Sequence, residues 1–211
     1  MKNVKYFVVL LFFVQLTISL AQENIVIIGQ KSGQLRTNYY LIYGEVSKVG
    51  TIIDVAADVD TLIKIIDEQN ITLKYILITH CHPDHIKGIP ALRQKFPEAK
   101  LCFSKQEYDD LQKYEEWEGS FAKELVDAWS AVPVVAKLMD YDYGLIGTLD
   151  LYIEDSDALN VGNFKINVLA TPGHTHGSLT FVVNNDIFSG VLIFYRSDGN
   201  MNCTLTSWDD I

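Results

Sequence analysis

The feature that most constrains this chain is the grouping of its histidines. All five fall in two short segments, Thr79-His-Cys-His-Pro-Asp-His85 and Thr171-Pro-Gly-His-Thr-His-Gly-Ser178. Histidines scattered through a core would not gather in this way, whereas imidazoles a few residues apart are typical of metal sites. A set of surface histidines without a metal is the alternative interpretation. The pattern favours a fold in which two distant segments meet.

The first segment lies between two regular elements. The apolar run from Tyr75 to Thr79 indicates a buried strand, and a helical pattern begins at Ile86. Loops that follow strands are where layered α/β proteins build their sites. His80 and His82 are two residues apart, so in an extended segment both side chains point the same way. We therefore expect these two imidazoles to bind one ion.

The residue types favour zinc. Imidazole nitrogen suits Zn²⁺, and a catalytic zinc has three protein ligands and one open position for water. His174, which follows the Pro172-Gly173 turn, is the expected third ligand. Asp84 and His85 are expected to face a neighbouring position, where they either bind a second metal or orient the water of the first. His176 either hydrogen-bonds substrate or solvent or is an ordinary loop residue.

The apolar pattern predicts strands first and then an alternation of strands and helices. Helices are expected over 58–70 and 86–96, and they should cover a sheet in a layered structure. The expected strands are 24–28, 38–43, 51–55, 74–79, 100–103, 149–153, 164–170, 179–183 and 186–194.

Residues 105–147 interrupt this alternation. They are helical in propensity, contain seven tyrosine, tryptophan and phenylalanine residues at the positions that helices use for packing, and lack an obvious strand. We interpret them as an inserted helical segment whose aromatic residues belong to the core. A cap over a pocket is the alternative.

The first 21 residues differ from the rest of the chain. Lys2 and Lys5 precede the apolar run 6–14, and Ser19 and Ala21 are small residues at the −3 and −1 positions before Gln22. This pattern is typical of a secretory signal peptide, and the apolar run is short for a membrane span. The prediction is a secreted, periplasmic or lumenal protein of residues 22–211 without a membrane segment after cleavage. An uncleaved N-terminal membrane anchor is the alternative.

The composition limits the kinds of molecule that the chain is expected to bind. The chain has 211 residues, 17 Lys and Arg against 27 Asp and Glu, a formal net charge of −10 and 48% hydrophobic residues. A chain of this size and hydrophobicity can bury a core, which excludes global disorder. Nucleic acid is not an expected partner, because its binding depends on clustered Lys and Arg. We expect a small-molecule substrate, and the oligomeric state stays open.

From about Thr51 to Asp210 the sequence resembles the metallo-β-lactamase superfamily, in particular its hydroxyacylglutathione hydrolase-like branch. The resemblance implies an α/β fold, a four-layer αββα sandwich whose second half is incomplete here. It assigns His80, His82 and His174 to a first metal site, and Asp84 and His85 to a second. The residues that carry it, besides the histidine segments, are Ile53-Asp54, the helix 58–70, Ile76-Leu-Ile-Thr79, Asp84-His-Ile-Lys-Gly88 and Phe188-Ser-Gly190.

Two ligands of the family are missing from this pattern. The family has an aspartate bridging both metals after the glycine that matches Gly190, where this chain has Val191. Either Val191 replaces the aspartate or the aspartate is deleted, and Asp186 and Asp198 are out of register. The family also has a further C-terminal histidine, and no histidine follows His176 here. The second site is therefore expected to be weak or absent, and the chain is either a C-terminally truncated product or a variant with one zinc or none.

The resemblance implies a zinc-dependent hydrolase of an ester, thioester, lactone or β-lactam carbonyl. Asp84 is the expected catalytic residue, which accepts the proton of the attacking water, and Asp54 is a candidate to orient a metal-bound imidazole. Phosphodiester hydrolysis is another possibility within the family. The alternative from another class is a degenerate, non-catalytic module without a complete dinuclear site.

Overall fold

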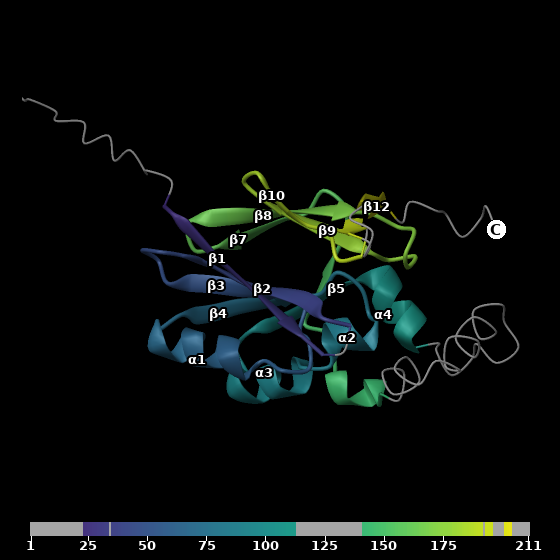
Figure 1. Ribbon diagram of the computed structural model, residues 1–211, viewed down its shortest axis with the longest axis horizontal. Coiled ribbons are helices and arrows are strands. Elements are labelled where there is room, and N and C mark those ends of the chain that lie inside the picture. The colour runs from purple at the N-terminus through teal and green to yellow at the C-terminus, as the bar shows by residue number, and fades with distance from the viewer. Residues whose placement is uncertain (1–22, 34, 113–140, 192, 196–200, 204–211) are drawn as a thin grey trace, which may run out of the picture.

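A computed structural model describes residues 23–33, 35–112, 141–191, 193–195 and 201–203. Two β-sheets face each other, and the helices lie on the outer face of the first sheet (Figure 1). The described residues therefore form three layers of the expected sandwich. The family-type α/β fold is confirmed, and no helix of the described residues covers the outer face of the second sheet.

The first sheet has six strands in sequence order, and its parallel half positions the site. β2 pairs antiparallel with both β1 and β3, whereas β3, β4, β5 and β6 pair parallel with one another in that order. Parallel strands bring their carboxyl ends to one edge of the sheet, so the loops after β3, β4 and β5 meet there. The strands are β1 (Ile25–Ser32), β2 (Thr37–Gly44), β3 (Val49–Ile53), β4 (Thr72–Leu77), β5 (Lys100–Ser104) and β6 (Leu151–Ile153).

The second sheet is antiparallel throughout, with the order β10-β9-β8-β7. Along β8 the side chains alternate between buried and exposed, which is the pattern of a sheet covered on one face. Its strands are β7 (Ala158–Val161), β8 (Phe164–Ala170), β9 (Leu179–Val183) and β10 (Asp186–Phe188). A separate ribbon pairs β11 (Ile193–Tyr195) with β12 (Met201–Cys203).

The helices are short and follow the parallel strands. α1 is amphipathic and buries Leu62 and Ile66 against the sheet. α1 spans Asp60–Glu68. The other helices are α2 (Pro83–Ile86), α3 (Ile89–Lys95), α4 (Lys105–Gln112) and the 3₁₀ helix η2 (Tyr143–Ile146).

The first sheet is apolar on both faces because it contributes to two cores. Ile52 and Ile76 pack under the helices, whereas their chain neighbours Ile53 and Leu77 pack against the second sheet. Consecutive side chains of a strand point to opposite faces, so a strand buried on both sides is read as a continuous apolar run. This explains the uninterrupted runs from which these strands were predicted.

Two predicted elements are wrong because glycines divide them. The helix expected over 86–96 is two helices, and Gly88 lies between them so close to the chain that an added Cβ would be 2.4 Å from the carbonyl oxygen of Ala56. The strand expected over 186–194 is divided between β10 and β11 at Gly190, whose φ is +57°. β7 and β12 were not predicted.

The interrupting segment is described only at its ends. Residues 105–112 form α4 and residues 143–146 form η2, and the interpretation of the whole segment as a helical insertion stays a prediction. Tyr108, Tyr141 and Tyr143 pack against the core under the helices. Residues 113–140, with the remaining aromatic residues of the segment, lie outside the described residues, as does the predicted signal peptide. Within the described ranges, none of the helices has the length and apolarity needed to cross a bilayer.

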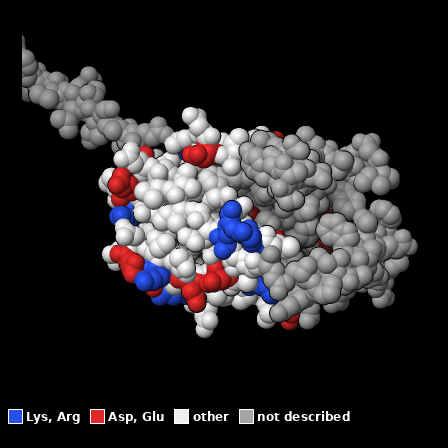
Figure 2. Space-filling model, viewed as in Figure 1, with Lys and Arg blue, Asp and Glu red and all other residues white. Residues whose placement is uncertain are grey.

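Charged residues lie mainly along the rim of the face shown in Figure 2. The described part of this face is largely uncharged apart from a small basic patch toward its right side, and acidic and basic side chains alternate at its lower border. It shows no extended basic area in the described part. The expectation that nucleic acid is not a partner stays a prediction.

Candidate metal centre

The two histidine segments meet at the carboxyl edge of the parallel strands. His80 and His82 follow β4, and His174 follows β8 of the second sheet. The N–H of Leu179 donates to the carbonyl oxygen of Thr79 at 2.8 Å, which joins the loop after β4 to the start of β9. The fold therefore brings together the residues that the sequence predicted to meet.

A tight turn presents His174. The N–H of Thr171 donates to the carbonyl of Ser178 at 2.8 Å and closes the loop. Gly173 has a φ of +147°, a conformation that favours glycine, and its N–H donates to the carbonyl of Thr175 at 3.1 Å. The Pro172-Gly173 pair thus turns the chain so that His174 reaches the other segment.

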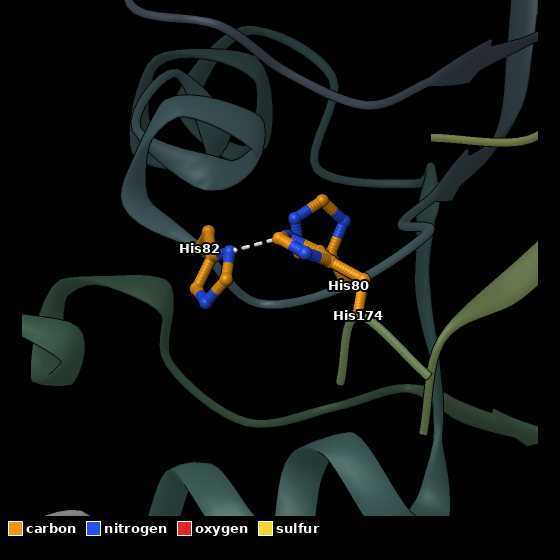
Figure 3. A group of neighbouring side chains, drawn as sticks. All are labelled: His80, His82 and His174. Atoms are coloured by element: carbon orange, nitrogen blue, oxygen red, sulfur yellow. Dashed lines mark hydrogen bonds between the residues drawn. The ribbon is translucent and has the colours of Figure 1, made fainter. Parts of the chain in front are cut away.

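Three imidazoles converge in this place (Figure 3). His80, His82 and His174 each offer a nitrogen atom, and these atoms lie within 4.8 Å of one another. Each pair of rings has its centroids 4.7 to 4.8 Å apart. Nδ1 of His82 and Nε2 of His174 are 2.9 Å apart. Two nitrogens bound to one tetrahedral zinc are about 3.4 Å apart, so the cluster fits a single ion after small side-chain rotations.

The hydrogen bonds of His80 leave one nitrogen for a metal. The carboxylate of Asp54 can only accept, so the hydroxyl of Thr79 donates to it at 2.9 to 3.0 Å. That hydroxyl must then accept from Nδ1 of His80, 3.0 Å away. Nε2 carries no proton in this tautomer, is buried, and has no partner among the described residues. A buried nitrogen lone pair facing two further imidazoles fits a cation.

The cluster is neutral at pH 7 because it is buried. Burial, with smaller effects from the neighbouring imidazoles, lowers the pKa of His80 well below its usual value. Burial likewise lowers the pKa of His82 and of His174 to about 4 in each case, although the charge of Asp84 acts in the opposite direction on both. Neutral imidazole is the form that binds metals, so no proton has to leave before an ion enters.

Comparison with known families agrees with this geometry. The family model of the metallo-beta-lactamase superfamily matches residues 32–211. The chain belongs to the metallo-beta-lactamase superfamily. Among solved structures, the metallo-beta-lactamase family protein TTHA1429 of Thermus thermophilus superimposes with a TM-score of 0.62 at 21% identity, over 87% of this chain and 64% of that one. At this identity the likeness shows the fold alone.

Curated relatives of the superfamily carry several activities in their names. Hydroxyacylglutathione hydrolase 1 of Vibrio vulnificus is 28% identical over 78% of this chain and 51% of its own length. Human mitochondrial persulfide dioxygenase ETHE1 is 29% identical over 64% of this chain and 39% of its own. The probable polyketide biosynthesis zinc-dependent hydrolase PksB of Bacillus subtilis is 24% identical over 77% and 58%. The chain thus spans about half the length of the curated relatives that it matches.

Asp84 and His85 lie beside the cluster and contact other partners. Nδ1 of His85 is 2.8 Å from Asp54, and its Nε2 is 3.3 Å from Asp84. The hydroxyl of Thr37 donates to Asp84 at 2.5 Å. Burial alone would lower the pKa of His85, but the two carboxylates outweigh it and raise that pKa. In the described part of the chain, Asp84 and His85 complete no second group of three metal-binding side chains. Their assignment to a second superfamily metal site stays a prediction.

Gly190 brings the position of the expected bridging aspartate to the site. An added Cβ on Gly190 would be 2.6 Å from the hydroxyl oxygen of Thr79, next to His80. The following residue is Val191, whose side chain offers no oxygen ligand. Asp186 is exposed in β10, and Asp198 lies outside the described residues. Neither therefore provides, within the described residues, the carboxylate that the superfamily has at this place.

Asp54 accepts from the hydroxyl of Thr79 and lies 2.8 Å from Nδ1 of His85, and its role in orienting a metal-bound imidazole stays a prediction. Glu107 is a buried residue that the sequence did not indicate. Glu107 is 2% exposed and accepts hydrogen bonds from the backbone of both histidine loops. The one signal in the sequence is Ser104-Lys-Gln-Glu107, which resembles a capping box at a helix start. The Ser104 side chain indeed accepts from the N–H of Glu107 at 3.0 Å. The Glu107 carboxylate, however, contacts loops that are distant in sequence.

A cavity of about 440 Å³ adjoins the turn that carries His174. The three clustered imidazoles are not part of its lining, which comes from the starts of α4 and β9 and from the ends of β6 and β8. His176 lines this cavity, and its Nδ1 is 3.4 Å from a carboxylate oxygen of Asp110. His176 is therefore outside the metal cluster.

Proposed function

We propose that this chain is a zinc-dependent hydrolase of a small ester, thioester, lactone or lactam, in which hydroxide attacks the carbonyl carbon and the single bond to the leaving oxygen, sulfur or nitrogen breaks. The observation that carries the proposal is the buried, unpartnered Nε2 of His80 beside the imidazoles of His82 and His174. These three residues would hold one zinc ion. When bound, zinc lowers the pKa of its water toward 7 and so supplies a hydroxide at neutral pH.

Asp84 is the general base and acid of this proposal. Its carboxylate is held by the hydroxyl of Thr37, and its charge reaches both His82 and His174. In this role it accepts the proton of the attacking water and returns it to the leaving group. Asp84 also pairs with His85, so the carboxylate has a fixed orientation at the edge of the cluster.

The ligand set favours zinc over the non-haem iron of an oxygenase. Iron oxygenases use two histidines and one carboxylate on one face of the metal. The cluster in the described residues consists of three imidazoles, and Val191 follows Gly190 where the superfamily supplies a carboxylate. The three imidazoles therefore favour the zinc chemistry of a hydrolase over the iron chemistry of the dioxygenase relative.

The test compares His174→Ala with His176→Ala, which removes a histidine from the same turn but outside the cluster. The full chain is stripped of metal with a chelator, reloaded with zinc and assayed with a thioester, a lactone and a β-lactam. The proposal predicts zinc-dependent hydrolysis of at least one of these substrates, lost in His174→Ala and retained with zinc content intact in His176→Ala. Zinc binding without hydrolysis of any substrate would favour the non-catalytic module instead.

A further inference from the structure

Glu107 is a carboxylate buried between the two histidine loops. Its Oε2 accepts the N–H of Cys81 at 2.8 Å, and its Oε1 accepts the N–H of Gly177 at 3.0 Å. Cys81 lies between His80 and His82, and Gly177 is in the turn that presents His174. One side chain therefore joins the backbones of the two segments that supply the clustered imidazoles.

The surroundings of Glu107 fix the position of its carboxylate. Glu107 is in the first turn of α4, where Ser104 accepts from its N–H. An added Cβ on Gly177 would be 2.4 Å from the Ser104 hydroxyl oxygen and 2.5 Å from the backbone nitrogen of Glu107. Only glycine lets the turn approach this closely. The start of α4 and the glycine of the turn therefore both contribute to the contact between Glu107 and Gly177.

Glu107 forms no salt bridge with a cation among the described residues, although it is 2% exposed. Two backbone N–H groups compensate part of the cost of burying its charge, because hydrogen bonds to an ionised group are stronger than neutral ones. The remaining negative charge lies between the two loops that carry the three imidazoles. A cation between the imidazoles would be stabilised by this charge.

We propose that Glu107 is a positioning residue of the metal centre, which sets the spacing between His174 and the His80–His82 loop and so determines the affinity for zinc. This inference rests on the proposed zinc site and assigns a role to a residue outside the ligand set. The side chain acts through the backbones at Cys81 and Gly177 and touches neither metal nor substrate. Loss of such a supporting contact lowers metal affinity by about 10- to 100-fold in other sites.

The test is Glu107→Gln, which keeps the shape but removes the charge and one acceptor. Glu23→Gln is the matched control, because Glu23 also accepts from the backbones of two distant segments, at Ser47 and Asn163. Those contacts lie where β3 begins, at the end of the parallel strands that is opposite to the histidine cluster. Zinc affinity is measured by competition with a chromophoric chelator, and the geometry of the site by the visible spectrum of the protein loaded with Co²⁺.

The expected result is a zinc affinity about 10- to 100-fold lower in Glu107→Gln, with an altered Co²⁺ spectrum, and an unchanged affinity in Glu23→Gln. Glu107→Asp, which keeps the charge, should recover part of the affinity. If Glu107→Gln does not fold, Gly177→Ala replaces it, because its added Cβ pushes the turn away from Glu107 and should have the same effect.

Two results would overturn the inference, and they are distinguishable. If the unmodified chain binds zinc and Glu107→Gln binds it within twofold with the same Co²⁺ spectrum, Glu107 has only a structural role. If the unmodified chain binds no zinc, the proposed function fails and the role of Glu107 fails with it. An equal loss of affinity in Glu23→Gln would show that any weakened carboxylate contact has this effect, which also contradicts the inference.

Discussion

At the scale of single residues, Thr79 decides what His80 can bind. Its hydroxyl donates to Asp54 and accepts from Nδ1 of His80, so Nε2 is left as the free lone pair. The sequence predicted that His80 and His82 lie together because the H-x-H spacing is local. It could not show that Thr79 connects Asp54 to His80, because that connection depends on how β3 and β4 pair in the sheet.

Thr79→Val tests this connection. The variant keeps the shape of the side chain but removes the acceptor of His80 and a donor to Asp54, and both groups are buried. We expect zinc affinity to fall about 10- to 100-fold and the free energy of unfolding of the metal-free protein to fall by about 1–3 kcal/mol. Chelator competition and urea denaturation measure the two effects.

Thr51→Val is the control for this variant. Thr51 is also fully buried in the sheet, and its hydroxyl donates to the carbonyl of Tyr75. It should lose stability without losing zinc affinity. A zinc affinity in Thr79→Val equal to that of Thr51→Val would refute the role of Thr79.

The lowered pKa values also predict how stability depends on pH. The imidazoles of His82 and His174 have a pKa of about 4 in the fold, whereas an unfolded chain has histidine pKa values near 6.5. Between these values the unfolded chain binds protons that the folded chain does not, so stability falls as pH decreases from 6.5 to 4. His85 has a raised pKa and acts in the opposite direction. The loss of stability from the three imidazoles with lowered pKa values, those of His80, His82 and His174, is larger than the gain from His85.

Urea denaturation of the metal-free protein at pH 7 and pH 5 measures the dependence. We expect lower stability at pH 5, with each depressed imidazole contributing on the order of 2 kcal/mol. His174→Asn should show a smaller decrease between the two pH values. An equal decrease in the free energy of unfolding of the variant and of the unmodified protein between pH 7 and pH 5 would contradict the neutral state of His174.

At the scale of elements, the loops after β3, β4 and β5 of the first sheet and the turn after β8 of the second sheet create the site. Strands with continuous apolar runs were predictable because their side chains fill two cores. The breaks at Gly88 and Gly190 were not, because they follow from close approaches to Ala56 and Thr79, which are distant in sequence. Glu107 was missed for the same reason, since its partners lie in two other loops.

Gly88→Ala tests whether the break between α2 and α3 is required. An added Cβ would be 2.4 Å from the carbonyl oxygen of Ala56 and 2.7 Å from the side chain of Val55, so the chain must move. We expect a loss of about 1–3 kcal/mol in the free energy of unfolding, measured with denaturant. Gly29→Ala meets only the ring of Tyr40 at 3.2 Å and should cost clearly less. Equal stability of the two variants would show that the break is not imposed by packing.

At the scale of the whole molecule, the chain combines the superfamily fold with a cluster of three imidazoles that could hold a metal. The family model covers residues 32–211, and the three imidazoles of the first site are together. Where the superfamily supplies a bridging carboxylate, this chain has Val191. The resemblance therefore predicted the fold and the cluster of three imidazoles, whereas the number of metal ions stays a prediction.

Export of the protein is a proposal that belongs to this scale. Expression of the full chain in a bacterial host with a secretion pathway should give a mature protein that begins at Gln22, as measured by intact mass. Ala21→Arg places a large charged residue before the cleavage position and should leave the precursor uncleaved. A membrane-bound protein that keeps residues 1–21 would support the membrane anchor instead.

The most direct test of the central claim is the zinc content per chain of the purified protein and of three histidine variants, measured by elemental analysis. One ion held by His80, His82 and His174 predicts about one zinc per chain, lost in His82→Ala and in His174→Ala but retained in His85→Ala. Two zinc ions per chain, with equal loss in all three variants, or no zinc in the unmodified protein would contradict this account.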